Sequence, residues 1–267
     1  MSSGKRRRQE ANQRRVELAE AERRRELRNR RLIVGGGWLV AVVVLVTMAV
    51  LLVTHHRSSS GSTTAATVRP TTPSDFGSTP CPSVAGDSPR TIHFTSAPRL
   101  CIDVTKQYVA TFHTTVGDFA ADLDPSKAPV TVNNFVVLAL YHYYDGTVFH
   151  RAIPGYVVQG GDADGKPPGS GNPGYTIADE FPASLSDYTV GSLAMANRDV
   201  PHSGASQFFV WLGPDQLPGP SYSLFGKVIS GLDVVRRIEA TGSPSGSVDH
   251  PVEIKSVSMG SAQIVSR

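Results

Sequence analysis

Two short stretches of the chain hold the residue types best suited to chemistry. The first sets a single arginine, Arg151, among apolar and amide side chains, and it reads Phe149-His150-Arg151-Ala152-Ile153-Pro154-Gly155-Tyr156-Val157-Val158-Gln159-Gly160-Gly161-Asp162. The second supplies the same residue classes as Ala196-Asn197 and Ser206-Gln207-Phe208-Phe209. A cation held in an apolar groove with amide groups is suited to binding a proline and stabilising its peptide bond as it twists.

The chemistry follows from the resonance of the peptide bond. Partial double-bond character leaves a rotation barrier of about 18–20 kcal/mol, which makes X–Pro isomerisation slow. Twisting breaks the resonance and returns a lone pair to the proline nitrogen. A donor aimed at that nitrogen therefore binds the twisted state better than either planar state. Arg151 is the candidate donor, since it stays charged and needs to transfer no proton.

Other chemistries fit these residues less well. His150 stands beside Arg151 but has no evident step of its own, so we expect it to be structural. The glycine-rich run 160–174 lacks Gly-Lys-Ser/Thr, which argues against a phosphate-binding loop. Asp162-Ala163-Asp164-Gly165 begins like a calcium loop, but Pro173 falls where the bidentate Glu would be. We expect neither a metal nor a cofactor.

The charge of the chain is concentrated at its N-terminus. Residues 1–31 hold twelve Lys and Arg against five Glu, whereas the remaining residues hold fourteen basic and eighteen acidic side chains. The overall basicity thus describes a tail and is no indication that the main domain binds nucleic acid. We expect no nucleic-acid partner.

Residues 32–53 form an uncharged, Val-, Leu- and Ala-rich run of 22 residues. As a helix rising about 1.5 Å per residue, the run would reach roughly 33 Å, enough to cross a hydrocarbon core. It is longer than the apolar region of a secretory signal and has no clear small-residue cleavage pattern after it. We predict an uncleaved single-pass anchor in the cell membrane. The basic tail then lies in the cytoplasm and the C-terminal body outside it.

The segment after the anchor, residues 54–80, is rich in Ser, Thr, Gly and Pro and is typical of a flexible tether. The chain has two cysteines, Cys81 and Cys101. In an extracytoplasmic compartment they could form a structural disulfide, and the alternative is two unpaired thiols. No Cys-x-x-Cys spacing suggests redox catalysis.

The folded body is predicted to contain many short strands and two helices. Segments 107–114 and 117–123 indicate a hairpin, 125–141 an amphipathic helix, 232–240 a second helix and 252–259 a last strand. This pattern favours a closed β-barrel with helical caps.

The sequence resembles the cyclophilin family from about Gln107 to Gly260. Several motifs in fixed order carry the resemblance: Asn134-Phe135, Phe149-His150-Arg151, Ile153-Pro154-Gly155-Tyr156, Gln159-Gly160-Gly161-Asp162, Leu193-Ala194-Met195-Ala196-Asn197, Ser206-Gln207-Phe208-Phe209 and Phe225-Gly226-Lys227-Val228. It implies an eight-stranded antiparallel closed β-barrel capped by two α-helices. With the apolar run before it, the chain resembles a membrane-anchored bacterial form of the family, similar to actinobacterial ones.

The resemblance also implies roles for individual residues. Catalysis would rest on Arg151, Gln159 and Phe209, and substrate binding on Tyr156, Val157, Ala196, Asn197, Gln207, Leu217 and Tyr222. Val157 stands where the family often has Met, and Leu217 where it often has Trp, so we expect a changed ligand profile with activity retained.

These observations predict a monomeric peptidyl-prolyl isomerase that acts on proline-containing proteins or peptides outside the membrane. The alternative is a module that docks proline peptides with little or no turnover. Retention of Arg151, Gln159 and Phe209 together favours the enzyme. The expected parts are a tail (1–31), an anchor (32–53), a linker (54–80), an extension of the outer domain (81–105), the isomerase domain (106–260) and a C-terminal tail (261–267).

Overall fold

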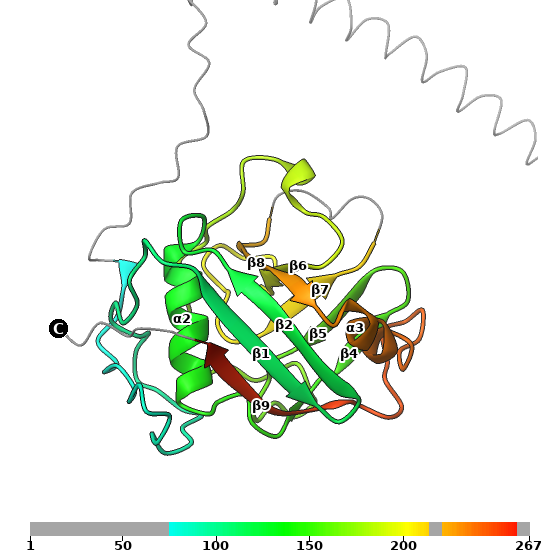
Figure 1. The fold of residues 1–267 in the computed structure, drawn as a ribbon, viewed down its shortest axis with the longest axis horizontal. Coiled ribbons are helices and arrows are strands. Elements are labelled where there is room, and N and C mark those ends of the chain that lie inside the picture. Colours follow the sequence, from blue (N-terminus) through cyan, green and yellow to red (C-terminus); the bar gives the residue numbers. More distant parts are fainter. Residues whose placement is uncertain (1–74, 214–220, 261–267) are drawn as a thin grey trace, which may run out of the picture. The chain divides into compact units, whose positions relative to one another are not determined.

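The computed structural model describes residues 75–213 and 221–260, where a single antiparallel sheet dominates (Figure 1). The sheet has nine strands in the order β3-β9-β1-β2-β8-β6-β7-β5-β4. Their bounds are β1 Tyr108–Thr114, β2 Gly117–Leu123, β3 Thr147–Val148, β4 Arg151–Ile153, β5 Val157–Gly160, β6 Ser192–Met195, β7 Phe208–Trp211, β8 Leu224–Ser230 and β9 Glu253–Gly260.

The first two strands confirm the predicted hairpin, with Tyr108 opposite Leu123 and Thr114 opposite Gly117. Along β1 the side chains alternate between buried and partly exposed, as expected for a strand with one face on a core. The predicted last strand is also present, as β9, which pairs with β1.

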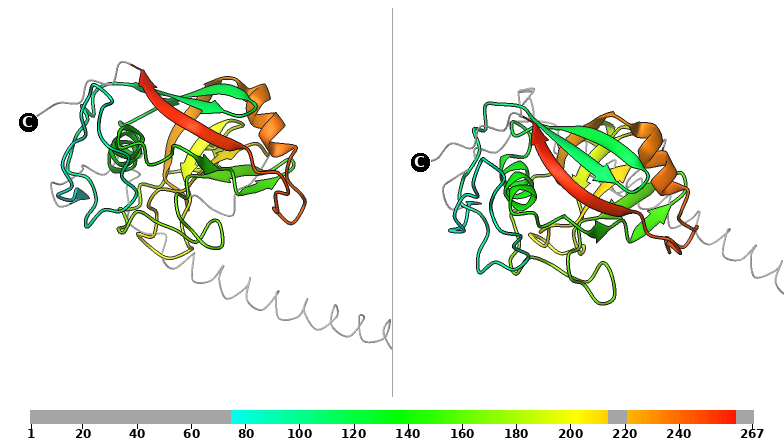
Figure 2. Two further views of the ribbon diagram at one scale, coloured as in Figure 1. Left: turned by 90° about the horizontal axis from the view of Figure 1, so that it is seen from below. Right: turned by 60° about the horizontal axis from the view of Figure 1, so that its bottom comes forward.

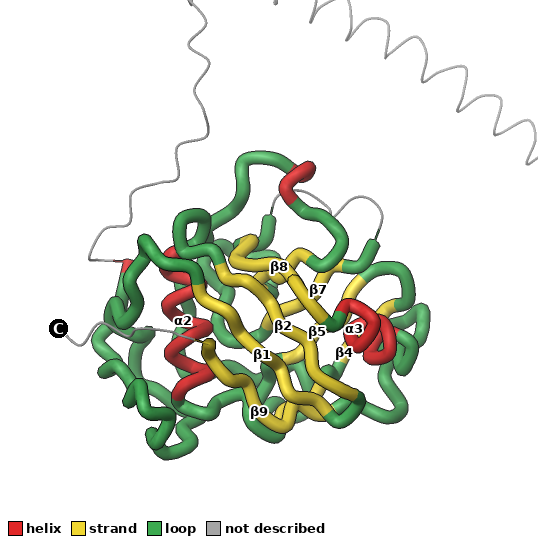
Figure 3. The backbone as a smooth tube through the Cα atoms, in the orientation of Figure 1, coloured by secondary structure: helices red, strands yellow, loops and turns green. Residues whose placement is uncertain are grey.

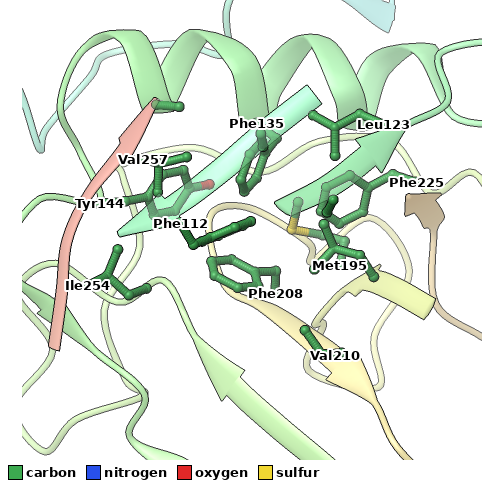
Figure 4. Packing of buried hydrophobic residues seen from close by; sticks show 14 of the residues in the cluster. Phe112, Leu123, Phe135, Tyr144, Met195, Phe208, Val210, Phe225, Ile254 and Val257 are labelled. Atoms are coloured by element: carbon green, nitrogen blue, oxygen red, sulfur yellow. The ribbon is translucent and has the colours of Figure 1, made fainter. Parts of the chain in front are cut away.

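Aromatic side chains fill the space that the curled sheet encloses (Figure 4). Phe112 of β1 stacks on Phe119 of β2 at 4.4 Å between ring centroids, and its ring lies 5.3 Å from that of Phe208 of β7. Phe135 meets Phe208 edge to face at 5.7 Å. Strands far apart in the sequence are thus joined through one core, and edge-to-face pairs add to the gain from burying their area.

Two α-helices lie at opposite ends of the curled sheet, α2 (Pro129–Leu140) and α3 (Leu232–Glu239), and a short 3₁₀ helix, η2, spans Leu185–Asp187 (Figures 1 and 3). Both predicted α-helices are therefore present. Helix α2 begins with Pro129 in its first turn, a position where the missing N–H costs nothing. The Glu180 carboxylate accepts hydrogen bonds from the backbone N–H groups of Val130 and Thr131 and so caps this end.

Helix α2 is not amphipathic as predicted, because all of its residues from Pro129 to Ala139 are buried. One side faces the core of the sheet, and residues 75–105, which we call the extension, cover the other (Figure 2). The amide of Asn133 joins the two parts: its Oδ1 accepts from the Cys101 backbone N–H at 2.7 Å, and its Nδ2 donates to the Arg99 carbonyl at 2.9 Å.

A disulfide between Cys81 and Cys101 closes a loop within the extension. Just before this loop, Thr79 forms an isolated bridge with Pro98: its N–H donates to the Ala97 carbonyl, and its carbonyl accepts from the Arg99 N–H. The Tyr141 hydroxyl at the end of α2 donates to the Pro80 carbonyl. The extension is thus folded onto the body that contains the sheet and α2.

The predicted eight-stranded closed barrel is corrected to a nine-stranded curled sheet. The strands β3 and β4 stand at the two ends of the strand order and do not pair with each other. The reason lies at β4, where the Ala152 N–H donates to the carbonyl of Gly246 in the loop after α3. The outer edge of β4 is therefore covered by a loop. An isolated bridge between Val148 and Asp162 joins β3 to the segment after β5.

Several sequence predictions lie outside the described residues, namely the basic tail 1–31, the anchor 32–53, most of the linker 54–80, Leu217 and the C-terminal tail 261–267. Within residues 75–213 and 221–260, no helix combines the length and the apolar character that a membrane crossing requires.

Replacing Asn133 should weaken the joint between α2 and the extension. An Asn133→Ala variant leaves the Cys101 N–H and the Arg99 carbonyl without their partner. We expect a loss of about 1–3 kcal/mol in the free energy of unfolding, measured by denaturant titration. A Lys255→Ala control at an exposed position of β9 should change it by less than about 0.5 kcal/mol. An Asn133 variant as stable as the control would contradict this account of the joint.

Candidate active site

Side chains along β5, β6 and β7 alternate between the two faces of the sheet, and each face carries one apolar cluster. Val158, Phe208 and Val210 point into the main core. Their neighbours in sequence, Val157, Phe209 and Trp211, belong to a separate outer cluster. Tyr188, Ala194 and Leu224 complete this outer cluster. Because successive side chains of a strand lie on opposite faces, one short sequence builds both the core and a second apolar surface.

The register of the strands places predicted site residues in a row across this outer face. Arg151 of β4 is paired with Gln159 of β5, Gln159 with Phe209 of β7, and Phe209 with Ala194 of β6. Directly opposed residues of antiparallel strands have side chains about 4.5–5.5 Å apart at Cβ. The three predicted catalytic residues are therefore neighbours although 58 positions separate Arg151 from Phe209 in the sequence.

A chain of hydrogen bonds runs from the arginine to a loop. The Arg151 Nη1 donates to Gln159 Oε1 at 3.1 Å, and Gln159 Nε2 donates to Gln207 Oε1 at 3.1 Å. Gln207 Nε2 donates in turn to the carbonyls of Gly169 and Gly171 at 2.8 and 3.0 Å. The two glutamines thus have defined amide orientations, and one edge of the guanidinium is held in place.

The loop that receives these bonds is organised around Asp162. Its carboxylate accepts four backbone N–H bonds, from Asp164, Gly165, Gly169 and Gly171, at 2.5–3.2 Å. Desolvation acts to raise the pKa of Asp162, but the four N–H donors outweigh it and hold the pKa below its ordinary value. Asp162 therefore stays ionised and fixes the positions of the loop carbonyls.

The apolar part of the site consists of aromatic rings around the outer cluster. The Tyr156 ring packs edge to face on Trp211 at 4.7 Å, and the Phe209 ring packs edge to face on Tyr222 at 5.1 Å. Val157 lies in the same cluster and is buried. Desolvation and the nearby Asp199 raise the pKa of Tyr222, so its hydroxyl remains protonated at neutral pH.

A pocket of about 360 Å³ adjoins this apolar surface and is lined by four predicted residues, Gln159, Ala196, Asn197 and Gln207, among others. The Asn197 Nδ2 donates to the Ser221 carbonyl at 2.7 Å, which fixes the side of the pocket nearest Tyr222. The structure thus brings together nine of the ten residues predicted for catalysis and substrate binding, in one cluster, one pocket and one hydrogen-bond chain. Leu217 lies outside the described residues.

The guanidinium of Arg151 is half-buried and forms no salt bridge with any carboxylate of the described part of the chain. Among residues 75–213 and 221–260, its one hydrogen bond to a side chain is that to Gln159, which leaves further N–H groups for a ligand. A neutral partner also leaves the positive charge uncompensated. Such a group suits stabilisation of an electron-rich atom in the groove.

His150 lies beneath the loop that receives these bonds and takes no part in the hydrogen-bond chain from Arg151 to that loop. Its ring lies against Gly169, and burial lowers the pKa of the imidazole, so the ring is neutral at neutral pH. The geometry agrees with the structural role expected for it.

Sequence reasoning missed three contributors to the site. Trp211 and Tyr188 complete the outer cluster, and the alternation with Phe208 and Val210 was the signal for Trp211. Gly246 lies against the aliphatic stem of Arg151 with a positive φ of 88°. A side chain there would crowd the arginine. Its position in a serine-rich turn gave no indication of that contact.

Comparisons with known proteins identify the family. The family model described as "Cyclophilin type peptidyl-prolyl cis-trans isomerase/CLD" matches residues 109–259. The chain is 40% identical over 145 residues to peptidyl-prolyl cis-trans isomerase-like 1 of Gibberella zeae, covering 52% of this chain and 85% of the relative. It is 39% identical over 167 residues to peptidyl-prolyl cis-trans isomerase B of Streptomyces anulatus, covering 56% and 93%.

A solved structure agrees with these relatives. The crystal structure of a cyclophilin-type isomerase from Cryptosporidium parvum superposes with a TM-score of 0.54 at 28% identity, over 58% of this chain and 99% of that one. Family, relatives and fold thus agree over the part of the chain that holds Arg151, Gln159 and Phe209. The chain belongs to the cyclophilin family of peptidyl-prolyl cis-trans isomerases.

Proposed function

We propose that Arg151 accelerates X–Pro isomerisation by donating a hydrogen bond to the proline nitrogen of a twisted peptide bond. The observation that carries this proposal is the row of Arg151, Gln159 and Phe209 across three paired strands. The row sets a cation with free N–H groups beside an apolar surface.

The apolar and the polar residues of the site have different roles in this proposal. The Phe209 ring, with Val157 and Tyr156, forms the surface on which a pyrrolidine ring would pack. Gln159, Asn197 and Gln207 supply polar groups to the peptide on either side of the proline. Each tenfold of acceleration needs about 1.4 kcal/mol of preferential binding to the twisted state, so a few contacts account for a useful rate.

A relative supports a proline peptide as the ligand. The cyclophilin-type isomerase of Cryptosporidium parvum has been solved in the presence of the dipeptide Ala-Pro, and that structure superposes on this chain with a TM-score of 0.53 at 29% identity. The superposition covers 57% of this chain and 99% of that one. The site residues described above fall within the range of the family match.

The isomerase acts on proteins outside the cytoplasmic membrane in this proposal. Support comes from the 22 uncharged residues 32–53 and the excess of Lys and Arg in residues 1–31. The disulfide between Cys81 and Cys101 is consistent with an oxidising compartment. Clients would be newly exported chains whose X–Pro bonds limit folding.

Arg151→Ala should abolish most of the turnover. Because the lost donor acts only on the twisted state, we expect kcat/KM for a proline peptide to fall by about 100-fold. Arg151→Lys keeps the charge but loses the planar fork, and it should fall between Ala and wild type. An Arg237→Ala control at the surface of α3 should retain full activity. A protease-free NMR exchange assay measures all three.

The same assay separates the enzyme from a docking module. If the wild-type chain binds the peptide but does not speed its exchange, the docking alternative holds. If Arg151→Ala speeds the cis–trans exchange of the peptide as much as the wild type does, the mechanism assigned to Arg151 is wrong.

Labelling of intact cells tests the location. An Ile229→Cys variant places a thiol on β8 at a side chain with 58% of its surface exposed. We expect a membrane-impermeant maleimide to label it as fully before lysis as after. A cytoplasmic protein with an exposed cysteine should be labelled only after lysis. If Ile229→Cys behaves like that control, the isomerase domain does not face outward.

A further inference from the structure

The extension lies before the region that matches the family, yet it contacts the loop that orients Gln207. We propose that Phe94 is a positioning residue for catalysis. It holds the loop 161–175, whose carbonyls orient Gln207. Gln207 in turn orients Gln159, and Gln159 orients Arg151. The inference rests on the proposed role of Arg151.

The first contact is made by the backbone and ring of Phe94. Its N–H donates to the Pro173 carbonyl at 2.8 Å, near the C-terminal end of the loop. Its ring packs edge to face on Tyr175 at 6.2 Å and on Tyr141, the residue after α2, at 5.3 Å between centroids. Phe94 therefore lies between a rigid helix and the end of the loop.

The loop approaches Phe94 so closely that no side chain fits between them. Gly174 has a positive φ of 101°, and a Cβ at this position would overlap the Phe94 carbonyl oxygen. Asn172, two positions earlier, lines the pocket and accepts a hydrogen bond from the Gly174 N–H at 2.8 Å. The contact with the extension is thus two residues from the pocket wall.

A second path leads from the same contact to the pocket. The Tyr175 hydroxyl donates to Asn134 Oδ1 at 2.6 Å, and Asn134 Nδ2 donates to the Ala205 carbonyl at 2.6 Å. Ala205 lines the pocket two positions before Gln207. Both the acceptors of Gln207 and the backbone that carries it are therefore connected to the loop that Phe94 contacts.

Asp162 alone does not hold the whole loop. Its four hydrogen bonds end at Gly171, so residues 172–175 depend on other partners. The extension supplies two of these contacts through Phe94, to the Pro173 carbonyl and to the Tyr175 ring, while Asn134 of α2 binds the Tyr175 hydroxyl. The extension is itself held by the disulfide and by both bonds of Asn133. Near the start of the loop, His93 also lies 3.4 Å from the Asp164 carboxylate. The extension thus contacts the loop near its start, at Asp164, and near its end, at Pro173.

A double-mutant cycle in the full chain tests whether Phe94 acts through Gln207. We expect Phe94→Ala to lower kcat/KM for a proline peptide by about fivefold in the wild-type background, and by less than about twofold when Gln207 is already Ala. A merely structural role would lower activity equally in both backgrounds. Each variant is assayed below the start of its thermal transition, and Phe94→Leu replaces Phe94→Ala if the latter is unfolded.

Controls on both sides of the contact complete the test. Phe94→Tyr keeps the ring and should restore activity, and Val84→Ala, at an exposed side chain of the extension, should have no effect. Gly174→Ala disturbs the contact from the loop side and should reproduce the loss. Equal losses from Phe94→Ala in both backgrounds, or no loss at all, would overturn the proposal. Arg151→Ala in the same assay shows separately whether the arginine mechanism holds.

Discussion

The alternation of side chains along β5, β6 and β7 is the constraint on which the site depends. One set of residues, including Val158 and Phe208, must be apolar to fill the core. The other set, including Val157 and Phe209, is thereby delivered to the outer face in fixed register with Arg151. A slip of one residue would exchange the two sets and destroy core and groove together. The stability of the core therefore enforces the geometry of the groove.

Polar contacts refine what the strands position. The guanidinium has only neutral partners in the described residues, and the two glutamines transmit its orientation to a loop gathered by Asp162. A carboxylate beside Arg151 would neutralise the charge that the proposed mechanism uses on the twisted peptide bond. The buried negative charge of Asp162 is instead held within its own loop, where backbone N–H groups donate hydrogen bonds to the carboxylate.

The sequence predicted the hairpin and both α-helices, because period-two and helical patterns are local signals. The ordered motifs also named nine residues that the structure brings together, although their roles stay predictions. Prediction failed where long-range contacts decide. Helix α2 was expected to be amphipathic, but the extension covers its outer side through Asn133 and the segment around Cys101. The closed barrel was wrong because Gly246 occupies the edge of β4, and nothing near residue 246 indicates that contact. The part played by Phe94 depends on the same kind of distant packing.

The most direct test of the central claim is a crystal structure of the protein with a bound proline peptide. The account predicts the pyrrolidine ring packed on Phe209 and Val157, with an Arg151 N–H within hydrogen-bonding distance of the proline nitrogen and the bond to Gln159 retained. A peptide bound with its proline elsewhere, or a guanidinium turned from the groove into an ion pair, would contradict it.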